Sequence, residues 1–339
     1  MFVGLDPDFD TFTYEKSLIA GQEFVKVGFA DPSLAGYYAA VVADTKHPQV
    51  DKIDADRLVT LVGRFPRSVL AEFNTHRVFS RNSASSRARS VKSVVESVLQ
   101  DPYVPLFTEN RPGMSGRFIQ DGNVVRQARE DWLAARDSAV ESFLRVLMGV
   151  EYNPDLSPGE NLDYYYENIY KNPDVTSGGV HKQDVNRLLE PFMWHEVVFT
   201  AAHWENFFAL RCDFEHTYIP FYAFAVLVRE ALRVSTPEVS EYHTPFLTSE
   251  EKDQLTGNMV ADQGLLMKSS SVAANISYRD AADTQASIRL GERLLEAGHM
   301  SPFEHVAYIS NNLGRPLGGN FGELWDQYRR FLEVENNNF

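Results

Sequence analysis

The stretch Glu72–Arg89, EFNTHRVFSRNSASSRAR, sets the expectations for the rest of the chain. It carries four arginines and no acidic residue after Glu72, although the 339-residue chain has a formal net charge of −15. Arginine offers a planar fork of donors to phosphate oxygens, and serine hydroxyls and backbone N–H groups can complete such a site. The stretch therefore predicts either a phosphate-binding segment or a polar helix end exposed to solvent.

The composition limits the classes of protein to consider. The chain is 44% hydrophobic with 23 Phe and 15 Tyr, enough for a large core. The single Cys212 excludes an intramolecular disulfide and a cysteine-based zinc site, and it fits a reducing compartment, so we expect a cytoplasmic protein. The start lacks signal-peptide features, and no apolar run approaches the roughly 18 residues of a membrane span. A pI near 5.1 argues against a general nucleic-acid binder but permits a small anionic ligand.

The strands and helices that hydrophobic periodicity indicates suit an α+β fold. The length fits one large domain or two small ones, and we expect a single domain over residues 1–339. Residues 1–36 are expected to be an irregular lead-in. Strands are expected at 37–43 and 58–62. Helices are expected from Pro66 toward His76, over 90–99, over 124–148 and within the aromatic-rich 181–233. Three regions are expected to be loops, inserts or linkers, the second with a small helix as the alternative: 101–123, 151–180 and 235–271.

Arg211 follows an apolar run, Phe207–Leu210, and its charge needs a partner if it is buried. That partner is expected to be Asp213, Glu215 or a bound anion. His299, Glu304 and His305 match no zinc-binding spacing, so no metal site is expected.

The spacing of His76-Arg77, seven residues, Ser85, and then Arg87 resembles the signature of the flavin-dependent thymidylate synthases. That signature is Arg-His-Arg, seven residues, Ser, and an Arg two residues later. Ser80 and Asn82 also match the family pattern. Four positions depart from it: Thr75 stands for the first Arg, Ser83 for Glu, Ala88 for Tyr and Glu72 for Gln.

Two further segments are similar to the same family. One is Arg187-Leu-Leu-Glu-Pro191 with Asn206 and Leu210-Arg211 downstream, and the other is Asn275–Tyr278 with His299-Met-Ser-Pro-Phe-Glu-His305. The last segment usually comes first in the family, so the chain resembles a circularly permuted, long variant of the phage or bacterial type. The resemblance implies a mixed or antiparallel sheet with packed helices, and a homotetramer with shared active sites.

The resemblance also implies roles for individual residues. Flavin contacts are expected from His76, Arg77, Asn82, Asn206, Ser277, Ser301 and Glu304. The nucleotide would be bound by Glu72, Ser85, Arg87, Arg187 and Arg211, with Arg211 against the pyrimidine ring as the catalytic residue.

The implied reaction is C5 methylation of a pyrimidine deoxynucleotide, dUMP to dTMP, with FAD as cofactor and methylenetetrahydrofolate and NADPH as co-substrates. After Leu-Arg the family usually has an Ala-Gln-x-Glu-Ile segment, and residues 213–219, Asp-Phe-Glu-His-Thr-Tyr-Ile, do not match its Gln and Glu positions. Methylation or hydroxymethylation of dCMP or dUMP for DNA modification, and a non-catalytic nucleotide-binding relative, therefore stay open. Nucleic-acid binding by Arg77–Arg89 is a further alternative that the net charge disfavours.

Overall fold

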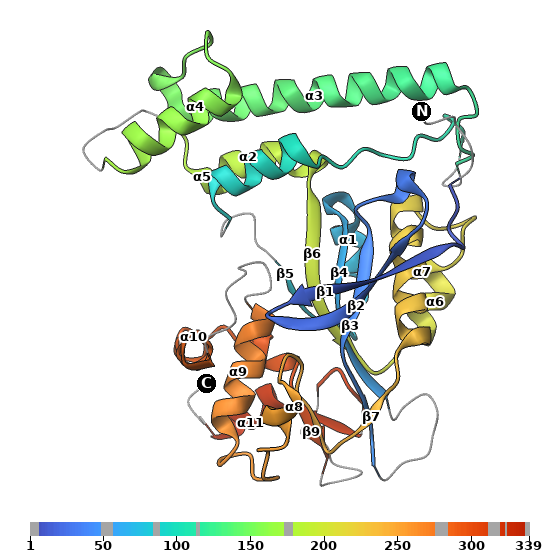
Figure 1. Cartoon of the computed structure of the whole chain (residues 1–339), viewed down its shortest axis with the longest axis vertical. Helices are drawn as coiled ribbons and strands as arrows, with labels where there is room; N and C mark the ends of the chain where they lie inside the picture. Colours follow the sequence, from blue (N-terminus) through green and yellow to red (C-terminus); the bar gives the residue numbers. More distant parts are fainter. Residues whose placement is uncertain are drawn as a thin grey trace. The chain divides into compact units, whose positions relative to one another are not determined.

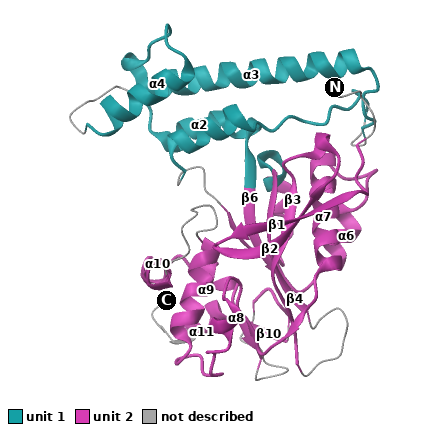
Figure 2. Ribbon diagram, viewed as in Figure 1, with its two compact units in different colours: residues 1–6, 66–70, 84–195 teal, residues 7–65, 71–83, 196–339 magenta. Residues whose placement is uncertain are grey.

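The computed structural model describes residues 7–48, 57–83, 89–112, 116–172, 179–274, 284–310, 319–322 and 324–335. It is an α+β protein whose chain divides into two compact units (Figure 2). Unit 1 comprises residues 1–6, 66–70 and 84–195, and unit 2 comprises residues 7–65, 71–83 and 196–339. The prediction of a single domain over 1–339 stays a prediction beside this division.

Unit 2 is built on a seven-stranded sheet with the order β1-β2-β3-β4-β6-β5, and a short β7 beside β3. The strands are β1 Phe12–Ile19, β2 Gln22–Phe29, β3 Tyr38–Lys46, β4 Arg57–Pro66, β5 Ser80–Ser83, β6 Trp194–Ala201 and β7 Glu238–Val239. The pairs β1–β2, β2–β3, β3–β4 and β5–β6 are antiparallel, and β7 runs parallel to β3. The strands predicted at 37–43 and 58–62 are thus confirmed as β3 and β4.

The N-terminal lead-in was wrongly predicted as irregular, because β1 and β2 form a hairpin there. The two strands are joined through Ala20 and Gly21, which both have positive φ, 51° and 79°. Such a two-residue turn matches the twist of a hairpin. Both strands mix polar and apolar residues, and most of their side chains are exposed or only partly buried.

Helix α7, Ile219–Val234, packs against β2 and β3 in unit 2 and is buried along most of its length (Figure 1). Its Phe224 ring lies so close to β4 that a Cβ on Gly63 would be 2.5 Å from it. Helix α6, Glu205–Arg211, precedes α7 in the chain, and the short α1, Leu70–Phe73, follows β4. These short helices carry Arg211 and Glu72.

The C-terminal part of unit 2 contains a second sheet, in the order β10-β9-β8. Its strands are β8 Tyr242–His243, β9 Ala307–Ile309 and β10 Trp325–Gln327. The helical elements here are α8 Ser249–Lys252, α9 Gln263–Ala274, α10 Thr284–Glu296, the 3-10 helix η6 Ser301–Glu304 and α11 Tyr328–Glu335. The prediction that 235–271 is a linker was wrong, because α9 is a core helix whose Ser269, Ser270 and Ser271 are fully buried and donate to backbone carbonyls.

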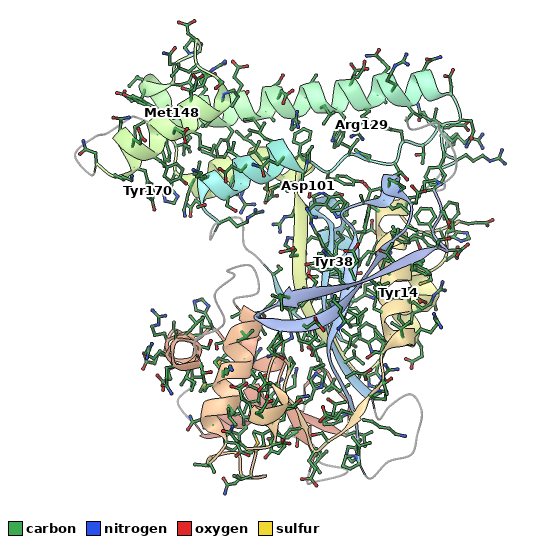
Figure 3. The ribbon with its side chains drawn as sticks, in the orientation of Figure 1. Tyr14, Tyr38, Asp101, Arg129, Met148 and Tyr170 are labelled. Atoms are coloured by element: carbon green, nitrogen blue, oxygen red, sulfur yellow. The ribbon has the colours of Figure 1, made fainter. Side chains whose placement is uncertain are left out.

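Unit 1 is mainly helical, with α2 Val91–Gln100 and the long α3 Gly122–Met148. Figure 3 labels Arg129 and Met148 along α3. Both helices agree with the sequence predictions, and Ser90 and Asp121 cap their N-termini. The remaining elements are α4 Pro158–Tyr164, a π-helix Tyr165–Tyr170, α5 Lys182–Val185 and the 3-10 helix η5 Asn186–Phe192. Within 151–180 the small-helix alternative is therefore the one observed.

Candidate functional site

Arg211, at the C-terminal end of α6, reaches the segment that follows α1 within unit 2. Its Nε donates to Nε2 of His76 at 2.9 Å, and its Nη1 pairs with the Glu72 carboxylate at 3.1 Å. Its Nη2 lies 3.4 Å from Thr75 Oγ1, and the guanidinium carbon lies 4.6 Å from the centre of the Phe221 ring. Three polar groups and one aromatic face thus fix the guanidinium, which is 18% exposed.

The bond from Arg211 determines the protonation state of His76. A guanidinium can only donate, so Nε2 of His76 must accept and the ring hydrogen must be on Nδ1. The ring is 6% exposed, stacks on Phe79 and meets the edge of Phe207. Burial first, and then the nearby charges of Arg211 and Arg81, lower the pKa of His76 to about 4. His76 is therefore a neutral acceptor near pH 7.

Arg81 on β5 lies on the other side of the His76 turn. Its Nη1 donates to the carbonyl oxygens of His76 at 2.9 Å and Asn74 at 3.3 Å, which holds the turn against the strand. Burial lowers the pKa of Arg81, and the charge of Glu304 opposes that shift. Glu304 belongs to η6, an element that packs against β5. The segment around His76 and the segment that ends in Glu304-His305, which both resemble the same family, therefore meet inside unit 2.

Gln327 on β10 ties these two segments together. Its Nε2 donates to Ser80 Oγ at 2.8 Å and to the carbonyl of Glu304 at 3.0 Å. Asn320 Nδ2 donates to the same Ser80 hydroxyl at 3.2 Å. The Glu304 carboxylate itself is bound by Arg329 of α11. Both ends of Glu304 are thus held within the chain.

Asn82 on β5 follows Arg81 and has a buried amide oxygen. Asn82 Oδ1 is buried and accepts no hydrogen bond from the residues that the structure describes. A buried acceptor without a donor is uncommon and calls for an explanation. A ligand with ring N–H groups, such as a flavin, would supply that donor, so this part of β5 fits the expected cofactor.

The other residues predicted for the site are placed differently. Arg77, Asn206 and Ser301 are exposed side chains of unit 2 that belong to the same three segments. Arg187 is an exposed residue of η5 in unit 1. The predictions for Ser85, Arg87 and Ser277 lie outside the described residues.

The expected pairing of Arg211 with Asp213 or Glu215 was wrong, whereas a bound anion as its partner stays a prediction. Asp213 instead accepts from His216 at 2.9 Å, and the backbone N–H of Glu215 donates to the same carboxylate. The actual partner, Glu72, is distant in sequence, so no local pattern revealed it. Sequence reasoning also missed Arg81, Gln327 and Arg329, whose roles depend on strand pairing and on the C-terminal elements.

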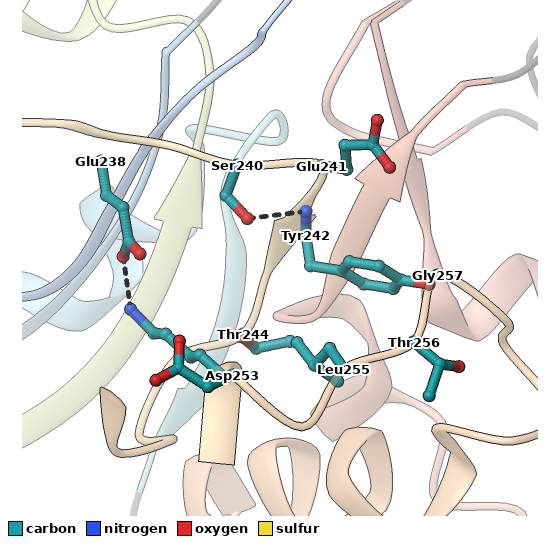
Figure 4. A pocket seen from close by; sticks show the side chains of 10 residues that line it. Glu238, Ser240, Glu241, Tyr242, Thr244, Asp253, Leu255, Thr256 and Gly257 are labelled. Atoms are coloured by element: carbon teal, nitrogen blue, oxygen red, sulfur yellow. Dashed lines mark hydrogen bonds and ion pairs between the residues drawn. The ribbon is translucent and has the colours of Figure 1, made fainter. Parts of the chain in front are cut away.

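A cavity of about 300 Å³ lies elsewhere in unit 2, between residues 238–244 and 252–257 (Figure 4). Lys252 pairs with Glu238 there at 2.6 Å, and the remaining wall is largely acidic or polar. None of the residues predicted for the site lines this cavity.

Among the residues that the structure describes, no group of three or more His, Cys, Asp or Glu side chains is arranged to hold a metal ion. No helix there combines the length and apolarity needed to cross a bilayer.

Comparison with known proteins gives no family model that matches and no curated protein that matches. Among solved structures, the UMP/dUMP methylase PolB from Streptomyces cacaoi bound with 5-Br dUMP is similar with a TM-score of 0.37 and 18% identity, over 53% of this chain and 68% of that chain. The same methylase bound with 5-Br UMP gives a TM-score of 0.39 and 15% identity, over 57% and 85%. TM-scores this low do not establish a shared fold.

Proposed function

We propose that this protein is a flavin-dependent enzyme that methylates C5 of a pyrimidine deoxynucleoside monophosphate, converting dUMP to dTMP. FAD would be the cofactor, methylenetetrahydrofolate the carbon donor and NADPH the reductant. One observation carries the proposal. Parts of three sequence segments that resemble the flavin-dependent thymidylate synthases, those around His76, Arg211 and Glu304, belong to unit 2, where Arg211 donates to His76 and the charge of Glu304 acts on Arg81. Arg187, from the second of these segments, belongs to unit 1.

In this proposal His76, Asn82 and Glu304 hold the flavin, since they line the adjoining elements β5 and η6 and the turn before β5. Asn82 Oδ1, which accepts no hydrogen bond from the described residues, would accept one from the flavin. Bound FAD, once reduced, supplies the hydride that completes the methyl group. The chain's own contribution is to position the reactants and to stabilise charge.

Arg211 would stabilise negative charge that develops on the pyrimidine carbonyl when C5 is alkylated. Its contacts with His76, Glu72 and Thr75 fix the guanidinium before a nucleotide arrives. A donor that is already oriented needs little reorganisation during the reaction. Glu72 pairs with Arg211, and its side chain is 44% exposed. We assign Glu72 to nucleotide binding at the solvent-facing side of Arg211.

A second candidate function, a nucleotide-binding relative without catalysis, is favoured by one specific observation. Arg211 and Glu304 both pair with groups of the chain itself, Glu72 and Arg329. Charges that are neutralised by a partner in the chain stabilise charge on a reacting ligand less strongly. The departures at Ser83, Ala88 and 213–219 also keep dCMP and a hydroxymethyl product within the proposal.

The permuted order of the segments and a homotetramer with shared sites are further parts of the proposal. Light scattering of the purified chain tests the tetramer. A monomer that binds FAD and turns over dUMP would remove shared active sites from the proposal and leave the chemistry in place.

The test of function incubates the purified chain with FAD and follows the visible absorption of the bound flavin. Release of tritium from C5 of labelled dUMP and, separately, dCMP then measures turnover, and mass spectrometry identifies the product. Arg211→Ala is expected to abolish tritium release and to retain FAD. Nucleotide binding without turnover in the unmodified protein would select the non-catalytic alternative, and failure to bind FAD would end the proposal.

A further inference from the structure

A line of five buried side chains runs through the interior of unit 2, from β3 through β8, β4 and β6 to the residue after η6. The distances are 2.8 Å from Thr45 Oγ1 to His243 Nδ1, 2.7 Å from His243 Nε2 to Thr60 Oγ1, 2.7 Å from Thr60 Oγ1 to Thr200 Oγ1, and 2.8 Å from Thr200 Oγ1 to His305 Nδ1. We call it the threonine–histidine chain. All four distances are those of good hydrogen bonds.

The two ends of the threonine–histidine chain differ. At one end, His305 Nε2 is buried and has no hydrogen-bond partner among the described residues. His305 as a whole is 0% exposed, whereas Thr45 at the other end is 4% exposed. Thr45 is thus the less completely buried end, and a hydrogen on His305 Nε2 has no access to solvent.

Both histidines of the chain are neutral near pH 7. Burial is the main cause, and it lowers the pKa of His243 and of His305 to about 3. A neutral imidazole donates from one ring nitrogen and accepts at the other. Each histidine therefore brings one hydrogen to the chain, as does each threonine.

Four bonds shared among five hydrogens leave one hydrogen over. If every inner hydroxyl both donates and accepts, only two arrangements exist. In the first, both histidines carry hydrogen on Nδ1, and the spare hydrogen is on the Thr45 hydroxyl. In the second, every bond is reversed, both histidines carry hydrogen on Nε2, and the spare hydrogen is on His305 Nε2.

The first arrangement is favoured, because it avoids an N–H group without an acceptor at the fully buried end. We propose that the threonine–histidine chain, ending at Thr45, holds the hydrogen of His305 on Nδ1 and so presents His305 Nε2 as an acceptor for a hydrogen-bond donor. Thr45 and His243 are positioning residues in this scheme, because they act on His305 through the intervening hydroxyls. The inference rests on the four distances, so it stands even if FAD does not bind.

Nitrogen NMR of the full chain, labelled in its histidine rings, distinguishes the two tautomers and so tests the proposal. In the unmodified protein, His243 and His305 are expected to share one tautomer, with hydrogen on Nδ1. Thr45→Val removes the hydroxyl together with its hydrogen, so four hydrogens and three hydrogen bonds remain. The one hydrogen left over is then on His243 Nδ1 or on His305 Nε2, and both rings are buried. Both histidines are then expected to shift to mixed tautomers, although His305 is four hydrogen bonds from the substitution.

Two control variants separate this effect from a loss of packing. Thr45→Ser keeps the hydroxyl and is expected to leave both histidine spectra unchanged. Thr217→Val removes another buried hydroxyl, which donates to the Leu210 carbonyl and is not part of the threonine–histidine chain. This variant is also expected to leave both histidine spectra unchanged. If Thr45→Val does not fold, Thr60→Val, which cuts the chain in the middle, is expected to abolish the shared tautomer.

Opposite tautomers on the two histidines of the unmodified protein would overturn the proposal. So would a His305 signal that is the same in folded Thr45→Val as in the unmodified protein.

Discussion

Replacing His76 with Phe tests the hydrogen bond from Arg211 most directly. The Phe ring can keep the contacts with Phe79 and Phe207, but Arg211 Nε loses the acceptor that lies 2.9 Å away. A hydrogen bond to a charged group contributes about 1.5–3 kcal/mol. If that energy orients Arg211 for the reaction, kcat/KM is expected to fall roughly 10- to 150-fold.

The assay is the rate of tritium release from C5-labelled dUMP at saturating FAD, with FAD affinity measured beside it. His76→Gln is the matched control, because its amide oxygen can occupy the place of Nε2 and accept from Arg211 Nε. That variant is expected to recover most of the activity that His76→Phe loses. Its recovery would assign the loss to the missing acceptor and not to the changed ring.

Equal losses in the Phe and Gln variants would refute the reasoning, since only one of them lacks the acceptor. A loss of FAD affinity that parallels the loss of turnover in both variants would instead make His76 a flavin ligand alone. Arg211 would then be oriented by Glu72 and Thr75 without help from the ring.

Three further predictions concern stability and are measured by urea denaturation. Four histidines have a pKa lowered mainly by burial, to about 4 for His76 and to about 3 for His195, His243 and His305. Histidines in the unfolded chain titrate near pH 6.5, so below that pH they bind more protons than the folded ones. The free energy of unfolding should therefore be complete above about pH 6.5 and fall toward about pH 4. A urea midpoint that is unchanged between about pH 7 and pH 5 would contradict this. Glu304→Gln removes the charge that pairs with Arg329 and should cost about 1–3 kcal/mol, a loss that should vanish in an Arg329→Ala background. Gly63→Ala places a carbon 2.5 Å from the buried Phe224 ring and should cost about 1–3 kcal/mol, whereas Gly159→Ala, with nothing within 4 Å, should not.

Elements with a clear hydrophobic pattern could be predicted from the sequence. Strand β4 is an apolar run buried at nearly every position, and α2 repeats valines at helical spacing over a capping serine. The missed hairpin β1–β2 shows the opposite case. Its strands mix polar and apolar residues, and the Ala20-Gly21 turn lacks the Asn-Gly or Asp-Gly signal.

Two other errors have tertiary causes. Strand β6 lies in an aromatic-rich stretch that was expected to be helical, and its short apolar run Val197-Val198-Phe199 does not distinguish a buried strand from a buried helix. Most of helix α9 lies in 235–271, which was expected to be a linker or surface excursion because it combines two prolines, a charged run and three consecutive serines. The serine hydroxyls bond nearby backbone carbonyls, and this lets polar side chains occupy a core position.

The candidate site was predictable only in part, for a physical reason. The residue types of the His76, Arg211 and Glu304 segments were visible in the sequence. Their pairing was not, because Glu72 with Arg211 and Arg329 with Glu304 are contacts formed by the tertiary fold.

The division into two compact units supplies an internal pair of optical reporters. The chain has four tryptophans, of which Trp132 and Trp194 belong to unit 1, and Trp204 and Trp325 belong to unit 2. Phenylalanine replacements in one pair or the other would leave an indole emission that reports on a single unit. Comparing the two variants in a thermal melt would show whether the units lose structure cooperatively or one after the other.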